Sequence, residues 1–63
     1  MAVLDDALAL RDSIGTAIKA DATVQAEVSP GGFGWGQLES IRTRLALAFT
    51  ESNEVIDALG GLP

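Results

Sequence analysis

The sequence predicts an all-α fold, an antiparallel helical hairpin, and three observations lead to it. Apolar residues recur at helical spacing in two long segments, at about 3–28 and about 37–59. One proline and four glycines interrupt this pattern at 29–36. The chain has 63 residues, so both segments belong to a single domain, 1–63.

The first helix is expected over about 3–28, with Gly15 as its only glycine. On a helical wheel its large apolar side chains share one side, and alanines fill the gaps between them. These residues are Val3, Leu4, Leu8, Leu10, Ile14, Ile18, Val24 and Val28. Their arc covers about 200°, whereas a helix that faces one core needs a stripe of about 100°. We therefore expect more apolar surface on this helix than one neighbouring helix can cover.

Arg11, Asp21 and Gln25 lie on the apolar side of the same helix and have two possible roles. They could set the register between helices from buried positions, as a polar residue does in a coiled coil. Alternatively, they border the apolar stripe and extend their polar ends into water. We predict the border position, because charged side chains are seldom buried without a partner.

The turn at 29–36 contains the sequence features that end the first helix. Pro30 disfavours helical geometry at Ser29, and the glycines allow positive φ angles. Phe33 and Trp35 lie in this turn. They either fold back to close the open end of the hairpin, which we favour, or project as an anchor for a partner.

The second helix is expected over about 37–59, with Gly36 as its N-cap. Steps of three and four residues define a seam: Leu38, Ile41, Leu45, Ala48, Ser52, Val55 and Leu59. Phe49 and Ile56 flank this seam, and the Ser52 hydroxyl should bond to a carbonyl one turn earlier. Gly60 and Gly61 predict a left-handed C-terminal cap within 60–63, and Pro63 cannot continue the helix.

Equal helices with a short connection pack antiparallel, and we expect the first helix to cover the narrow apolar face of the second. Such a hairpin leaves the wide face of the first helix partly uncovered. The chain has no cysteine or histidine, so neither disulfides nor a zinc site can support it. We therefore expect oligomerisation into a helical bundle, or docking on a larger protein. The residues predicted to form interfaces are Leu4, Leu8, Ile14, Ile18, Phe33, Trp35, Leu38, Ile41, Leu45, Phe49, Ile56 and Leu59.

Charge and hydropathy narrow the class of partner. The net charge of −5 argues against binding to nucleic acid or to anionic membranes. The 48% hydrophobic content exceeds that of disordered chains, yet no apolar run approaches the ~18 residues of a membrane span. We expect a protein partner, a homo-oligomer or a larger protein assembly, in the cytoplasm or within a particle assembled there.

Neither a catalytic site nor a cofactor or metal site is predicted. Histidine, the commonest general base, and cysteine, which supplies a thiol nucleophile, are both missing from the sequence. Asp5 and Asp6 point about 100° apart on a helix, and Glu51 and Glu54 have no third ligand nearby. Two helices also offer no obvious cleft for a small-molecule substrate.

The sequence therefore favours a non-catalytic structural or assembly protein. Such a chain would self-associate or clamp a larger protein assembly, as a small virion or scaffold-like component does. The alternative is an acidic regulatory module, antitoxin-like or anti-factor in kind, that binds a basic protein. Only the second function predicts binding that salt weakens.

Overall fold

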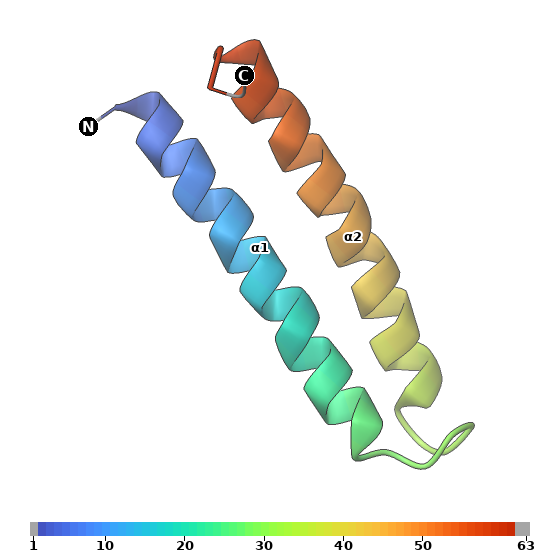
Figure 1. Cartoon of the computed structure of the whole chain (residues 1–63). Coiled ribbons are helices and arrows are strands. Elements are labelled where there is room, and N and C mark those ends of the chain that lie inside the picture. The colour runs from blue at the N-terminus through green and yellow to red at the C-terminus, as the bar shows by residue number, and fades with distance from the viewer. Residues whose placement is uncertain (1, 62–63) are drawn as a thin grey trace.

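The computed structural model describes residues 2–61 and consists of two α-helices packed against each other. Helix α1 (Val3–Ala26) and helix α2 (Trp35–Ala58) run antiparallel, with the turn at one end and both chain ends at the other (Figure 1). The molecule measures 43 × 17 × 17 Å. The predicted all-α helical hairpin is confirmed.

The observed helices are displaced slightly from the predicted boundaries. Helix α1 ends at Ala26 instead of about residue 28, and α2 begins at Trp35 instead of residue 37. The predicted N-cap at Gly36 is wrong, because Gly34 caps α2 with φ +88° and its carbonyl accepts the Leu38 N–H at 2.9 Å. A left-handed residue at this position needs glycine, which explains the shift.

Two successive β-turns connect the helices. In the first, Ser29–Gly32, the last N–H donates to the first carbonyl at 2.8 Å. Gly31 supplies the positive φ, +74°, that the third position of a type II turn requires, and Pro30 is a common residue at the second position. In the second, Gly32–Trp35, the closing bond is 3.1 Å long and Gly34 takes the left-handed position. Two turns in series reverse the chain within a few residues.

The C-terminal end of α2 is closed by the predicted glycine cap. Gly60 has φ +75°, and its N–H donates to the Asp57 carbonyl at 2.9 Å. The Gly61 N–H donates to the Ile56 carbonyl at 3.0 Å, which completes a Schellman motif. A Cβ at Gly61 would collide with the Leu4 side chain, so this glycine also lets the cap pack on α1. The prediction for Pro63 lies outside the described residues.

The interior of the hairpin is sparse. Among residues 2–61, only Ala7 and Ile56 are buried hydrophobic residues, and Ile56 is the one large side chain with no exposure. The radius of gyration is 14.3 Å, whereas a compact domain of this length has about 11 Å. Two helices alone therefore form an extended contact and no enclosed core.

Candidate interaction surface

The contact between the helices follows one row of residues on each helix, which we call the inner seam. All of its members are buried or half-buried, and they recur in steps of three and four. On α1 they are Leu4, Ala7, Arg11, Ile14, Ile18, Asp21 and Gln25, and on α2 they are Trp35, Leu38, Arg42, Leu45, Phe49, Ser52 and Ile56. Five of these fourteen residues are polar or charged, so the seam is a mixed surface.

The observed inner seam on α2 differs from the seam predicted for that helix. Ile41 and Val55 were expected to face α1, but both are exposed. The helix is instead rotated so that Phe49 and Ile56 face α1. Phe49 and Ile56 bury more apolar area than Ala48 and Val55 would bury from the same turns, which favours the observed rotation.

Two of the polar residues on α1 also correct the sequence-based prediction. Asp21 is only 7% exposed and Gln25 only 4%, so they do not border the stripe. Within the described chain, Asp21 Oδ1 and Gln25 Nε2 are buried and have no hydrogen-bond partner. Arg11 is half-buried, and its Nη1 donates to Asn53 Oδ1 at 3.3 Å across the two helices. The seam therefore carries unsatisfied polar groups near its turn end.

The Ser52 hydroxyl behaves as predicted. It donates to the Phe49 carbonyl at 2.7 Å, which satisfies a polar group that is 5% exposed. This bond lets a small polar residue occupy the inner seam without a partner on α1.

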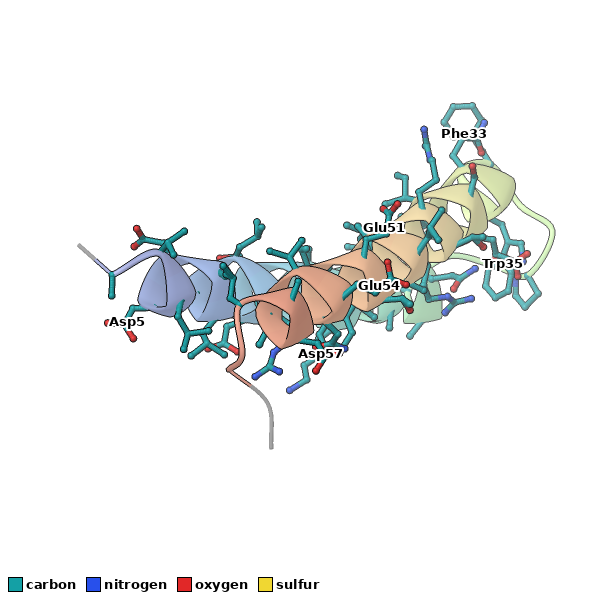
Figure 2. The ribbon with its side chains drawn as sticks, turned by 90° about the horizontal axis from the view of Figure 1, so that it is seen from above. Asp5, Phe33, Trp35, Glu51, Glu54 and Asp57 are labelled. Carbon is teal, nitrogen blue, oxygen red and sulfur yellow. The ribbon has the colours of Figure 1, made fainter. Side chains whose placement is uncertain are left out.

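The two aromatic residues of the predicted turn have different environments. Phe33 is 98% exposed and projects from the tip of the turn, away from both helices (Figure 2). Trp35 is half-buried and is the first residue of the inner seam on α2. Phe33 therefore does not close the end of the hairpin, which contradicts the favoured interpretation for that residue.

A second row of residues, which we call the outer stripe, is aliphatic on both helices. It consists of Val3, Leu10, Ala17 and Val24 on α1, and Ile41, Ala48 and Val55 on α2. Its valines, leucine and isoleucine are between 39% and 65% exposed, and its alanines are half-buried. Each member precedes an inner-seam residue and follows the previous member by seven positions, so the row stays on one side of each helix.

The two halves of the outer stripe lie on the same face of the hairpin. Gly15 on α1 and Asn53 on α2 each directly follow an inner-seam position. Gly15 lies beside Phe49 of α2, and Asn53 accepts a hydrogen bond from Arg11 of α1, so both residues lie on the same flank of the helix contact. In an antiparallel helix pair, the residues that precede the seam positions then share the opposite flank. The outer stripe is therefore one continuous apolar face.

Sequence reasoning found only part of this face. Ile41 was among the predicted interface residues, but Val3, Leu10 and Val24 were not, although each was assigned to the apolar side of α1. The seven-residue repeat that joins them was the available signal. The other predicted residues on the helices, Leu4, Leu8, Ile14, Ile18, Leu38, Leu45, Phe49 and Ile56, are buried or half-buried within the hairpin, and Leu59 is exposed near its end.

The flank opposite the outer stripe has a different character. An open depression of about 480 Å³ is lined by Arg11, Asp12, Gly15, Thr16, Lys19 and Phe49. Sequence reasoning did not anticipate this open depression, whose lining combines charged side chains with the Phe49 ring. No group of three or more potential metal ligands occurs in the part of the chain that the structure describes.

Within residues 2–61, neither helix has the length and apolar content needed to cross a membrane. Comparisons with protein-family models, with curated proteins and with solved structures gave no match to this chain.

Proposed function

We propose that this chain is a non-catalytic structural or assembly protein that works by packing its helices against other protein chains. Its targets are further copies of itself or a larger protein assembly, such as a virion or scaffold. The observation that carries this proposal is the continuous apolar outer stripe beside a sparse inner seam. Contiguous exposed apolar patches are typical of protein interfaces.

The energetics of a chain this small support the same function. A domain of about 60 residues is marginal even when its core is well formed, and here only Ala7 and Ile56 are buried hydrophobic residues among those described. The isolated hairpin should therefore gain much of its stability from a partner, since a ligand that binds only the folded state stabilises it by mass action.

The test is the dependence of folding on protein concentration. We expect the helical circular dichroism and the melting temperature to rise with concentration across the micromolar range, in step with a sedimentation mass above that of one chain. A melting temperature independent of concentration, together with a folded monomer at micromolar concentrations, would contradict assembly as the function.

An acidic regulatory module that binds a basic protein is the second candidate. It is favoured by exposed carboxylates on α2, where Glu51, Glu54 and Asp57 follow one another toward the end of the helix (Figure 2). Such binding should weaken as salt rises, because exposed charges are screened beyond about 8 Å at physiological ionic strength. Co-purification of a basic partner that is insensitive to high salt would exclude this candidate.

A further inference from the structure

We infer that the outer stripe is the contact surface for a second copy of this chain, so that two hairpins form a four-helix bundle. This inference rests on the proposed assembly function and specifies its interface and partner. It assigns the inner seam to the contact within each hairpin and the outer stripe to the contact between hairpins.

The side chains of the outer stripe are those of a buried surface. All seven are aliphatic and uncharged, whereas the inner seam includes Arg11, Asp21, Gln25, Arg42 and Ser52. The exposed face is thus more apolar than the face that is already packed. Burial of aliphatic side chains is the main favourable term in association, and charged residues are depleted at interface centres.

The exposed area of the hairpin is consistent with one missing partner of similar size. The chain exposes 4420 Å². A folded monomer of 6.5 kDa is expected to expose about 3,800 Å². The excess of roughly 600 Å² is comparable with the ~800 Å² that each partner contributes to a standard interface. One second hairpin is enough to cover it.

The order of side chains along the stripe makes it complementary to itself. The register set by Arg11–Asn53 and Gly15–Phe49 aligns three layers to within one residue. They pair Leu10 with Val55, Ala17 with Ala48, and Val24 with Ile41. Within these three layers, which leave out Val3, the pattern reads large, small, large and is symmetric about the alanine layer.

A two-fold axis through the alanine layer matches this symmetry. Whether the second hairpin lies with its turn at the same end or at the opposite end, large layers meet large layers and alanines meet alanines. A two-fold interface requires such a patch, because the same surface is presented by both subunits. The small side chains of Ala17 and Ala48 allow the helices to approach closely at the centre.

The net charge of −5 opposes self-association, but none of it lies within the stripe. On the side of the stripe away from the inner seam, the neighbouring charged residues Asp6, Glu27, Arg44 and Glu51 are exposed. Their repulsion is screened by salt, whereas the attraction between aliphatic faces is not. Self-association should therefore strengthen as salt rises, which is opposite to the behaviour of a complex with a basic protein.

Two leucines of similar exposure provide a matched test. Leu10 lies in the outer stripe and is 55% exposed, while Leu47 is 60% exposed and lies outside both rows. Leu10→Gln should raise the dimer dissociation constant at least about tenfold, because two half-exposed leucines per dimer lose their apolar contact. Leu47→Gln should change it less than twofold, since glutamine and leucine have similar helix propensities. Sedimentation equilibrium measures both constants.

The outcomes separate the interface from the function. A wild-type dimer that Leu10→Gln does not weaken, or that Leu47→Gln weakens equally, would overturn the outer stripe as the interface and leave assembly intact. A folded wild-type monomer that takes up no partner would overturn both. A dimer dissociation constant that rises with salt would mean that charged contacts hold the two copies together, which would overturn the aliphatic stripe as the interface.

A cysteine cross-link keeps the test decisive if Leu10→Gln does not fold. The natural chain has no cysteine, and alanine to cysteine is a small change. Under oxidation, Ala17→Cys alone, or mixed with Ala48→Cys, should form covalent dimers, because a disulfide needs Cβ atoms about 4 Å apart. Ala46→Cys, which is exposed on the opposite flank, is the control. Equal cross-linking of Ala46→Cys, or none at positions 17 and 48, would contradict the proposal.

Discussion

The inner seam and the outer stripe run along the same two helices but differ in composition and burial. The inner seam is covered, yet within residues 2–61 its buried atoms Asp21 Oδ1 and Gln25 Nε2 have no hydrogen-bond partner. The five larger side chains of the outer stripe are 39–65% exposed, yet all of its side chains are aliphatic. In an isolated globular domain the two compositions would be reversed, because burial favours apolar side chains and penalises unpaired polar ones.

The difference supports the proposal that the hairpin supplies one half of a core. The inner seam holds α1 to α2 mainly at the end where Ile56 is enclosed and the glycine cap packs on Leu4. Near the turn, Asp21 and Gln25 weaken the same contact. Association through the outer stripe would cover apolar surface on both helices and so hold them together from a second side.

The largest expected effect comes from Ile56, the one large side chain with no exposure among those described. Ile56→Ala should lower the free energy of unfolding by about 2–4 kcal/mol, because it removes buried methyl groups and leaves a cavity. A chain this small should then be largely unfolded at room temperature. Thermal circular dichroism at a fixed high protein concentration measures the loss.

Val55, which precedes Ile56 in the sequence, tests whether the outer stripe and the inner seam differ in their contribution to stability. Val55→Ala removes methyl groups from the outer stripe, where they are half-exposed. It should leave the hairpin folded at high protein concentration and raise the concentration needed for folding. If Val55→Ala and Ile56→Ala shift unfolding equally at every concentration, the two rows are not energetically distinct.

A gain in stability is expected at Gln25, where the inner seam is least suited to burial. Its Nε2 is buried and has no hydrogen-bond partner among the described residues, and such a group costs about 1–3 kcal/mol. Gln25→Met keeps the length of the side chain and removes that cost, so the melting temperature should rise. Gln37→Met, at an exposed position of α2, should change stability by less than about 0.5 kcal/mol.

The opposite result for Gln25→Met would change the assignment of the inner seam to the contact within the hairpin. If Gln25→Met lowers stability, the amide has a partner in the associated state, and the inner seam near the turn belongs to the interface between chains. A chemical denaturation curve at two protein concentrations distinguishes that result from a change within the hairpin.

The sequence contained enough information for the fold but not for the rotation of α2. Helical periodicity, Pro30 and the two terminal glycines determined the elements and the turn, because these signals act locally. The rotation of α2 depends on which of two overlapping apolar rows faces α1. Ile41 and Val55 fit one row, whereas Phe49 and Ile56 fit the other, and local pattern does not choose between them.

The candidate interface was only partly predictable for the same reason. The excess apolar surface of α1 followed from its wide arc, and the exposure of Val3, Leu10 and Val24 is consistent with it. The sequence alone suggested that α1 would cover the apolar face of α2, which is wrong, because Ile41 and Val55 are exposed as well. Likewise, the burial of Asp21 and Gln25 opposes the usual preference of polar residues for water.

The smallest predicted changes in stability come from two glycines that belong to neither row. They show how much a change in the helix backbone alone alters stability. Gly60 has φ +75° in the cap of α2, so Gly60→Ala should destabilise the hairpin by about 1 kcal/mol. Gly36 lies inside α2 and a Cβ there would meet no atom within 4 Å. Gly36→Ala should therefore stabilise the helix by about 0.5–1 kcal/mol.

Both glycine substitutions change the folding of each chain without altering the outer stripe. Their effects on dissociation of the proposed dimer should be negligible, whereas Leu10→Gln should act mainly on that step. Denaturation and sedimentation of Gly36→Ala and Leu10→Gln, measured together, therefore separate the stability of the hairpin from its association. Gly36→Ala could instead lower the dimer dissociation constant as much as Leu10→Gln raises it. Folding and association would then be one inseparable transition, and neither row could be assigned to a single contact.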